Sequence, residues 1–341
     1  MPSKTPIGRL GLIIISLLYL TACHRQARSI SFYYWKTNFQ LDSAETDAIK
    51  SNQVKSVYVR YFDIDFVPGN NDPRPVSPIR FDSAPLICEL IPVVYIKNRT
   101  FEQIDSGKIE SLTRKVFSLV SSINRYIGQD PGEIQFDCDW TETTREKYFL
   151  FLKLYRRLSN GLLSATIRLH QVKYAGRTGI PPVDYGVLMY YNMGQINAAP
   201  ASSIYEKSIA EKYNPYLTDY PLKLAAALPV FSWGLQISEG HVVKLISKLN
   251  LRDLENDSNF TEKNKNWFAV KHAGFHRGYY FKENDVIKLE YTPAKELYSM
   301  VSDLDKYAGN RIGKLIFFDL DRTNLILYEK DFFRKIAAGA Y

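Results

Sequence analysis

The chain has 341 residues, of which 45% are hydrophobic, 23% charged and 14% aromatic. This composition excludes an intrinsically disordered chain, a collagen-like fibre and a polytopic membrane protein, and the length allows either two domains or one large α/β barrel. The 44 Lys and Arg residues and 36 Asp and Glu residues give a formal net charge of +8, but the basic residues are scattered, so we expect no nucleic-acid partner.

The first 22 residues have the organisation of an export signal. Lys4 and Arg9 form a basic start, and an apolar run follows from residue 10 to residue 20. This run is too short for a membrane span, so we interpret residues 1–22 as a signal peptide that is removed from the protein.

The signal ends in the residues Leu20-Thr-Ala-Cys23. This ending resembles the lipobox of bacterial lipoproteins, in which the cysteine that follows the cleavage point is lipidated. The resemblance implies a lipid anchor at Cys23, a short tether over residues 23–30, and a place in the cell envelope on the periplasmic side of the outer membrane. The alternative is an ordinary cleaved signal that happens to contain a cysteine.

Eight short β-rich runs alternate with helix-like stretches along the rest of the chain. Several of the runs are apolar at nearly every position, which is typical of parallel strands covered on both faces. The predicted strands are residues 31–36, 56–63, 86–96, 133–139, 163–170, 186–192, 222–231 and 314–319. The predicted helices are residues 43–52, 109–127, 143–160, 202–212, 239–249 and 292–307.

This alternation predicts an α/β fold, a (β/α)8 TIM barrel that forms a single domain over residues 31–341. An open doubly wound sheet is the second choice. The chain has neither a GxGxxG motif after the first strand nor a GxxxxGK[ST] motif, so we expect no nucleotide cofactor. A long stretch, about residues 236–310, separates the seventh and eighth strands and is predicted to be an insertion over the carboxyl ends of the strands.

Two carboxylates stand on one face of the fourth predicted strand. Because side chains alternate along a strand, Gln135, Asp137 and Asp139 share a face, while Ile134, Phe136 and Cys138 share the other. The apolar set suits packing against helices, so we expect the acidic set to point into the barrel and up to its mouth. Closely spaced carboxylates favour acid/base chemistry, with Asp139 as the acid/base and Asp137 in support. The alternative is a structural pair of ion-paired acids.

The neighbouring strands offer partners for these carboxylates. On the fifth strand the same alternation places Thr166, Arg168 and His170 inward, with Arg168 next to the acids and His170 nearest the mouth. Similar parity on the second strand predicts that Tyr58, Arg60 and Phe62 point inward. We take His170, Arg168 and Arg60 as candidate substrate contacts.

Two motifs on these strands resemble a known enzyme family. Residues 137–140, Asp-Cys-Asp-Trp, resemble the Asp-x-Asp-Trp-Glu signature of the family 18 glycoside hydrolases, the chitinases and their relatives, and residues 189–192, Met-Tyr-Tyr-Asn, resemble the Met-x-Tyr-Asp of that family. The resemblance implies a glycosidase-like barrel. Thr141 stands where the family has its proton-donating glutamate, Asn192 replaces the aspartate, and Glu142 comes one residue late.

A second resemblance extends over most of the barrel. It is to a family of uncharacterised bacterial barrel proteins, the domain of unknown function 3142, and it rests on residues 136–139, 163–166, 183–184, 189–194 and 228–229. It implies the same fold without an established activity.

Aromatic side chains near the predicted strand ends suit a carbohydrate, because they can stack on pyranose faces. The candidates are Trp140, Tyr191 and Trp233, with Tyr190, Trp267 and either Tyr34 or Trp35; burial in the core is the alternative for each. Asn192 completes the predicted substrate contacts. His272 and His276 are four residues apart, but Gly274 between them argues against a helix and there is no third ligand nearby, so no metal site is expected.

Three functions remain open on these observations. The first is a lipid-anchored glycoside-hydrolase-like protein that acts on a glycan through Asp137 and Asp139, with a second carboxylate from Asp63, Asp319 or another residue of the mouth. The second is a glycan-binding barrel that has lost the catalytic acid, as Thr141 suggests. The third is an envelope lipoprotein that uses the barrel as a scaffold. Cys88 and Cys138 are either a disulfide or two buried thiols.

Overall fold

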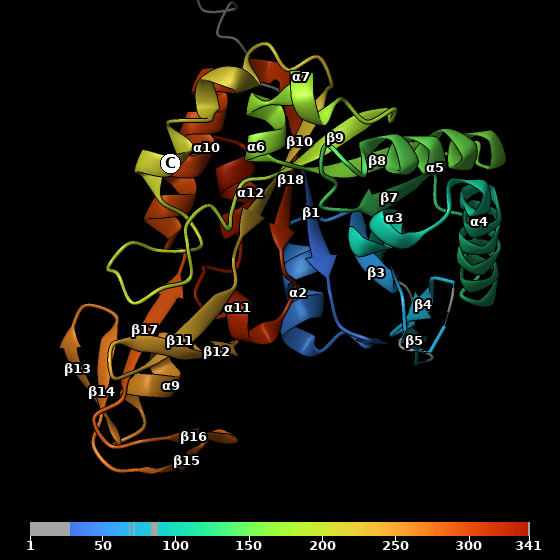
Figure 1. Cartoon of the computed structure of the whole chain (residues 1–341). Helices are drawn as coiled ribbons and strands as arrows, with labels where there is room; N and C mark the ends of the chain where they lie inside the picture. Colours follow the sequence, from blue (N-terminus) through green and yellow to red (C-terminus); the bar gives the residue numbers. More distant parts are fainter. Residues whose placement is uncertain (1–27, 68, 71, 83–87, 340–341) are drawn as a thin grey trace, which may run out of the picture.

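The computed structural model describes residues 28–67, 69–70, 72–82 and 88–339, and the export signal and Cys23 lie outside these residues. Eight parallel strands form a closed barrel, because β1 pairs with both β3 and β18 (Figure 1). The predicted TIM barrel is therefore confirmed. The barrel strands are β1 (Ser29–Tyr34), β3 (Ser56–Asp65), β6 (Glu89–Ile96), β7 (Glu133–Asp137), β8 (Leu162–Arg168), β9 (Tyr185–Met189), β10 (Leu224–Pro229) and β18 (Ile312–Phe318).

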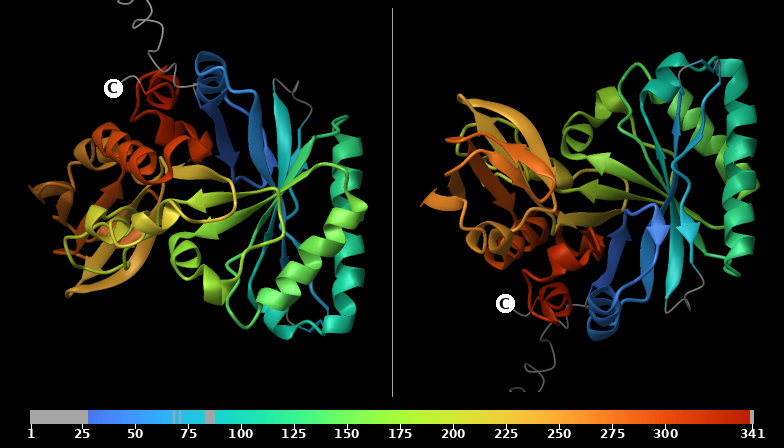
Figure 2. Two further views of the ribbon diagram at one scale, coloured as in Figure 1. Left: turned by 90° about the horizontal axis from the view of Figure 1, so that it is seen from above. Right: turned by 90° about the horizontal axis from the view of Figure 1, so that it is seen from below.

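Helices cover the outside of the barrel (Figure 2). The longest described helix, α4 (Ile109–Tyr126), buries residues spaced three and four apart, which gives it one apolar face toward the strands. A capping box at Asp42 and Glu45 fixes the start of α2 (Ser43–Ser51). The other helices are α3 (Arg99–Gln103), α5 (Arg145–Leu158), α6 (Leu169–Lys173), α7 (Ala175–Thr178), α8 (Lys207–Ala210), α10 (Ala294–Ala308), α11 (Arg322–Leu325) and α12 (Phe332–Ala337). None of the described helices is long and apolar enough to span a membrane.

Two separate apolar clusters follow from the alternation of side chains along the strands. The outer cluster includes Ile134, Phe136 and Cys138, and the Phe136 ring lies 5.0 Å from Phe151 and 4.8 Å from Tyr155 of α5. The inner cluster fills the barrel with residues that include Tyr33, Tyr58, Ile91, Val93, Val187 and Ile316. Cys138 is buried, and both Cys88 and Cys138 are free thiols.

The side chains of β3 do not alternate between the inside and the outside of the barrel as predicted. Tyr58 lies in the inner cluster, but Phe62 lies in the outer one, so the prediction that Phe62 points inward is wrong. The reason is a register shift between Arg60 and Phe62 in the pairing of β3 with β6, which inverts the alternation from that point on.

A polar network closes the end of the barrel where the strands begin. The buried Glu133 carboxylate accepts hydrogen bonds from the hydroxyls of Tyr58, Tyr185 and Ser164. The ammonium group of Lys314 contacts both this carboxylate, at 3.6 Å, and the Tyr58 hydroxyl, at 2.7 Å. Because these side chains fill the interior, the barrel is a packed core rather than a channel.

The chain between β10 and α10 forms an antiparallel sheet of its own beyond the carboxyl ends of the barrel strands (Figure 1). Its order is β12-β11-β17-β14-β13, with a separate hairpin of β15 and β16. A small core of its own, which includes Leu249, Phe268 and Ile287, supports it. The elements are β11 (Ser232–Ser238), β12 (His241–Ser247), α9 (Leu251–Glu255), β13 (Phe260–Asn264), β14 (Trp267–Val270), β15 (Gly274–His276), β16 (Tyr279–Phe281) and β17 (Val286–Tyr291).

Two predicted helices are wrong in whole or in part. Within residues 239–249 the chain forms the strand β12 instead, because His241–Ser247 pairs with β11 as an edge strand of the sheet. Of residues 202–212, only Lys207–Ala210 forms a helix. The loop after β3 also carries short strands, β4 (Arg74–Val76) and β5 (Arg80–Phe81), and β4 pairs with the end of β3 at the barrel mouth.

Candidate functional site

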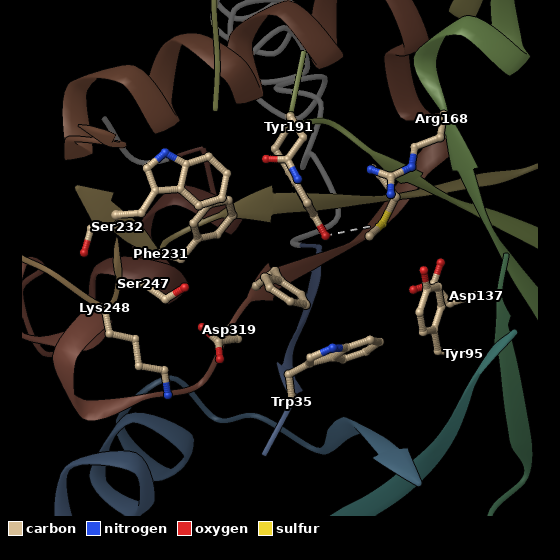
Figure 3. Close-up of a pocket in the computed structure, with 14 residues that line it drawn as sticks. Trp35, Tyr95, Asp137, Arg168, Tyr191, Phe231, Ser232, Ser247, Lys248 and Asp319 are labelled. Atoms are coloured by element: carbon tan, nitrogen blue, oxygen red, sulfur yellow. Dashed lines mark hydrogen bonds between the residues drawn. The ribbon is translucent and has the colours of Figure 1, made fainter. Parts of the chain in front are cut away.

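A pocket of about 450 Å³ lies at the carboxyl ends of the barrel strands, between the barrel and the inserted sheet (Figure 3). Most of its lining comes from residues that end a barrel strand or directly follow one, because parallel strands bring their carboxyl ends to one face. The lining residues are Trp35, Tyr95, Asp137, Arg168, Met189, Tyr191, Asn192, Phe231, Ser232, Trp233, Ser247, Lys248, Phe318 and Asp319.

Five aromatic rings form a continuous wall in this pocket. The Phe318 ring centroid lies 5.4 Å from Trp35, 5.7 Å from Tyr191 and 5.9 Å from Phe231. The Phe231 ring in turn lies 5.0 Å from Trp233. Since the rings pack against one another at an angle, each fixes its neighbours, and the pocket presents preformed apolar surface to a ligand.

Asp137 ends β7 and faces into this pocket. It is 7% exposed, and one carboxylate oxygen, Oδ1, accepts a 2.6 Å hydrogen bond from the Thr166 hydroxyl. Burial and the neighbouring charge of Asp139 raise the pKa of Asp137 to about 6, although Arg168 and the Thr166 hydrogen bond oppose this shift. Asp137 therefore titrates near neutral pH.

Asp139 has a different environment two residues further on. The Arg168 guanidinium donates to it twice, from Nε to Oδ1 at 2.6 Å and from Nη2 to Oδ2 at 3.1 Å. Its side chain is 48% exposed. His170, the second residue of α6, is exposed and does not line the pocket. Burial lowers the pKa of His170, and so does Arg168, while Asp139 acts in the opposite direction.

Asp319 provides a second buried carboxylate directly after β18. It is 7% exposed, and its Oδ1 accepts a hydrogen bond from Asn324. Burial raises the pKa of Asp319 to about 6, with Lys248 opposing the shift.

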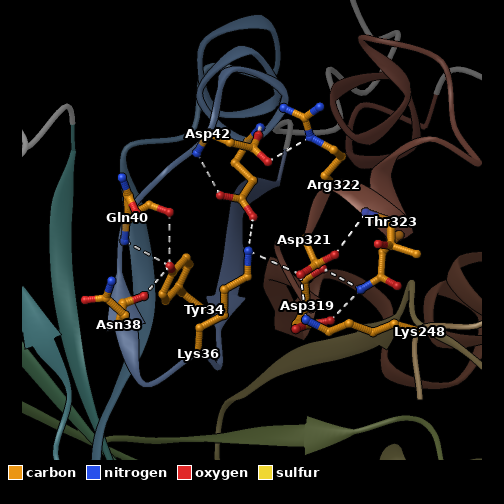
Figure 4. A network of polar contacts seen from close by, with 12 residues as sticks. Tyr34, Lys36, Asn38, Gln40, Asp42, Lys248, Asp319, Asp321, Arg322 and Thr323 are labelled. Carbon is orange, nitrogen blue, oxygen red and sulfur yellow. Dashed lines mark hydrogen bonds and ion pairs between the residues drawn. The ribbon is translucent and has the colours of Figure 1, made fainter. Parts of the chain in front are cut away.

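A network of cations and carboxylates lies beside Asp319 (Figure 4). Lys248, which follows β12 in the inserted sheet, donates to Asp321 Oδ2 at 2.6 Å, and Lys36 lies 3.2 Å from the same oxygen. Lys36 also forms an ion pair with Glu45. Burial alone would raise the pKa of Asp321, but the hydrogen bonds from Lys248 and from the Thr323 amide lower it to about 2. The inserted sheet is thus tied to the barrel next to the pocket.

Four of the predicted substrate contacts line the pocket, namely Arg168, Tyr191, Asn192 and Trp233. The indole Nε1 of Trp233 donates to Glu290 at 2.8 Å, which fixes the ring. Asn192 adopts a left-handed backbone conformation, with φ of 54°. Arg60 is not part of the lining: its guanidinium is bound by Asp63 and lies 5.9 Å from the Trp35 ring.

Comparison with known proteins places the barrel among chitinase-like folds. No protein-family model and no curated protein matches the chain. The spore cortex-lytic enzyme SleL of Bacillus cereus superposes with a TM-score of 0.55 at 14% identity, over 91% of this chain and 74% of that one. A GH18 chitinase from Cycas revoluta gives 0.55 at 12% identity, over 92% and 99%. The chitinase-like agglutinin of Robinia pseudoacacia gives 0.54 at 11% identity, over 91% and 98%.

These structural similarities show the fold. At the mouth of the barrel, the residues after β7 differ from the family 18 signature. Thr141 is exposed, and its hydroxyl lies 2.9 Å from that of Thr143 and 3.2 Å from that of Thr144. Glu142 is exposed and paired with Arg177 at 2.7 Å. Neither residue is among those that line the pocket, so no carboxylate from this turn stands beside Asp137 there.

Trp140 does not contact the pocket, and the prediction that it stacks on substrate is corrected. It is 1% exposed, its ring lies 5.4 Å from that of Tyr148 in α5, and its Nε1 donates to the Thr178 carbonyl at 2.9 Å. Side chains alternate along this segment, so Trp140 points toward the helices, as Phe136 and Cys138 do.

Several lining residues lay outside the predicted site, among them Tyr95, Phe231, Lys248 and Phe318. Tyr95 and Phe318 stand near or at the ends of predicted strands, and strand ends at a barrel mouth are the signal that would have found them. Lys248 had no such signal, because the inserted sheet brings it there. Among the described residues, no group of three or more His, Cys, Asp and Glu side chains is placed to hold a metal ion.

Proposed function

We propose that this protein binds a glycan in the pocket at the barrel mouth, as a lipid-anchored protein of the cell envelope. The observation that carries the proposal is the wall of five aromatic rings flanked by Asp137 and Asp319. Flat apolar rings suit the faces of pyranose sugars, and a few fixed polar groups beside them provide orientation. Most ligand pockets have volumes of about 300–1,000 Å³, and this pocket is within that range.

Two observations favour glycan binding without hydrolysis over hydrolysis that follows the family 18 mechanism. Thr141 occupies the position of the proton donor, and a threonine hydroxyl does not serve as an acid near neutral pH. Asp139 is bound by the Arg168 guanidinium and does not line the pocket. The fold likeness to a chitinase-like agglutinin supports a binding role for such a barrel.

The proposed anchor is a lipid on Cys23. The ending Leu20-Thr-Ala-Cys23 after a basic start and an apolar run supports it. One acyl chain gives only weak membrane binding, so stable anchoring would need the several chains that lipoproteins carry. The proposed location is the periplasmic side of the outer membrane.

The test is a binding screen of the full chain, purified in a mild detergent, against a panel of oligosaccharides by calorimetry. We expect a binder whose affinity falls about fivefold in Trp35→Ala, because an aromatic contact contributes roughly 1 kcal/mol. Tyr126→Ala, at a ring 77% exposed on α4, is the matched control and should bind normally. A panel without any binder, or equal affinity in both variants, would remove the proposal.

Hydrolysis through a different pair of carboxylates is the second candidate. Asp137 and Asp319 line the same pocket and both have a pKa of about 6, a value suited to acid/base chemistry near neutral pH. Release of reducing ends from the bound oligosaccharide, abolished in Asp137→Asn and in Asp319→Asn, would favour this candidate over binding alone.

A further inference from the structure

The acidic side chains of the barrel mouth fall into two groups by their partners. Asp63 is paired with Arg60, Asp65 with Lys97 and Arg99, Asp139 with Arg168, and Asp321 with Lys36 and Lys248. Among the described residues, neither Asp137 nor Asp319 has an ion-pair partner. These two carboxylates are also the ones that line the pocket.

Each of these two carboxylates uses only one of its oxygens in the described structure. Oδ1 of Asp137 accepts from Thr166, and Oδ1 of Asp319 accepts from Asn324. Within the described residues, Oδ2 of each has no hydrogen-bond partner. An ionised carboxylate can accept about four hydrogen bonds, and a buried charge is costly unless it is paired. Both groups therefore favour a ligand that brings a cation.

The cations that do line the pocket are already neutralised. Arg168 is bound at two points by Asp139, and Lys248 is bound by Asp321. The remaining charged groups near the two carboxylates are Asp63 beside Asp137, and Lys36 and Asp321 beside Asp319. Once these pairs are formed, the pocket has two unpaired negative charges.

The aromatic wall adds to the preference for a cation. In Figure 3, Asp137 and Asp319 lie on either side of Trp35, with the rings of Tyr191 and Phe231 in the same space. The Phe318 ring also lines this pocket. The faces of aromatic rings attract cations, most strongly where water is excluded. The rings also provide flat apolar surface for a sugar. The combination suits a ligand with both a pyranose face and a positive charge.

We propose that the pocket selects a glycan with unsubstituted amino groups, whose ammonium groups bind Asp137 and Asp319, over the same glycan in its N-acetylated form. This inference rests on the proposed function and specifies its substrate class. An ammonium group donates charge-assisted hydrogen bonds to a carboxylate, whereas a neutral acetamido group leaves the buried charge without a cation.

The test compares two ligands of equal length, a glucosamine oligomer and its N-acetylglucosamine counterpart, by calorimetry on the full chain in detergent. At about pH 6.5 we expect the glucosamine oligomer to bind at least tenfold more tightly. At about pH 5 its affinity should fall several-fold for each carboxylate that must ionise, because both have a pKa of about 6 and are mostly protonated at that pH. The N-acetylated oligomer should change little.

Asp137→Asn and Asp319→Asn, which keep the size of the side chain, should each reduce the preference for the glucosamine oligomer, and thermal melting would verify that both variants are folded. Asp72→Asn, at an exposed carboxylate paired with Lys108 outside the pocket, is the matched control and should keep the preference. Equal affinity for the two oligomers, or tighter binding of the N-acetylated one, would overturn the selectivity and leave glycan binding intact. Failure of both oligomers and of the wider panel to bind would remove the proposed function, and this inference with it.

Discussion

Arg168 holds Asp139 with two hydrogen bonds, and this pairing gives Asp139 an environment different from that of Asp137, two residues earlier at the end of β7. Asp139 has its charge balanced by a cation at the rim. Asp137, two residues earlier and buried, receives one neutral hydrogen bond from Thr166. The two acids of one short motif therefore have different roles: one fixes the arginine, and the other remains open to the pocket.

The first prediction concerns the effect of this arginine on Asp137. The positive charge of Arg168 lowers the pKa of Asp137, so Arg168→Gln should raise it further above about 6. Carbon-13 NMR of the carboxyl group, followed through a pH titration, measures the change. Arg177→Gln removes an exposed cation paired with Glu142 and should leave the titration unaltered. An unchanged Asp137 pKa in Arg168→Gln would show that the charge of Arg168 has no effect on the ionisation of Asp137.

The second prediction is a pH-dependent gain in stability. The pKa of Asp137 is about 6 in the folded chain and 3.8 in its ordinary state, so the folded state binds the extra proton between these values. Protonation of Asp137 contributes its full share to the free energy of unfolding below about pH 4, and this share is lost as the pH rises through 6. Asp137→Asn should therefore stabilise the protein at pH 7 by roughly 2–3 kcal/mol, with no gain near pH 3.5. Urea unfolding at both pH values measures this difference.

Asp321 is the control of opposite sign for that experiment. The pKa of Asp321 is lowered to about 2. Ionised Asp321 therefore adds to the free energy of unfolding above about pH 4, and this stabilisation is lost as the pH falls through 2. Asp321→Asn should destabilise the protein at pH 7 by about 2 kcal/mol. If both variants shift stability in the same direction at pH 7, the explanation by pKa is wrong for at least one of them.

The third prediction uses the four tryptophans of the chain. Trp35 and Trp233 line the pocket, whereas Trp140 is buried against α5 and Trp267 lies in β14. A bound glycan should change the emission of the first two because it replaces the water next to their rings. We expect a fluorescence change that is reduced in Trp35→Phe and in Trp233→Phe and retained in Trp267→Phe. A change carried mainly by Trp267 would place the ligand on the inserted sheet.

The fourth prediction concerns the contact between the inserted sheet and the barrel. Lys248 donates to Asp321, so Lys248→Met should raise the pKa of Asp321 above about 2 and weaken the attachment of the sheet. Hydrogen exchange of the amides in β11 and β12 should then become faster, while amides in β7 and β8 keep their protection. Lys263→Met, at an exposed lysine of β13, is the control. Equal exchange in both variants would mean that Lys248 does not hold the sheet.

The fifth prediction tests the anchor. Cys23→Ala should abolish incorporation of a labelled fatty acid and release the protein from the membrane fraction, because no other lipid attachment is proposed. Cys88→Ala, at a partly buried free thiol just before β6, should remain in the membrane fraction. Fractionation of cells that express each variant gives the result, and a membrane-bound Cys23→Ala protein would contradict the lipobox interpretation.

The barrel strands could be predicted from the sequence because parallel strands buried on both faces leave a strong signal. The run around Val94 and the run around Val187 are apolar or small at almost every position, and both form strands. The edge strand β12 has no such signal, since residues such as Val243 and Lys244 are exposed, and only its pairing with β11 makes it a strand.

The site could be predicted only where it follows from strand parity. Asp137 and Thr166 were placed inward by alternation and do meet inside the barrel mouth. Phe62 was misplaced because one bulge in β3 inverts the alternation. Lys248 reaches the pocket through the tertiary fold of the inserted sheet, and no local pattern around it carries that information.

The first described residue, Arg28, is fixed at the floor of the barrel, where its guanidinium donates to the carbonyl of Ile312 at the start of β18. Cys23 precedes it by five residues, a length that spans at most about 18 Å when extended. A lipid on Cys23 would therefore hold the closed floor, with its Glu133 network, close to the bilayer surface. The pocket would open on the far side of the barrel, so that the protein would face away from its own membrane and meet its ligand from the opposite direction.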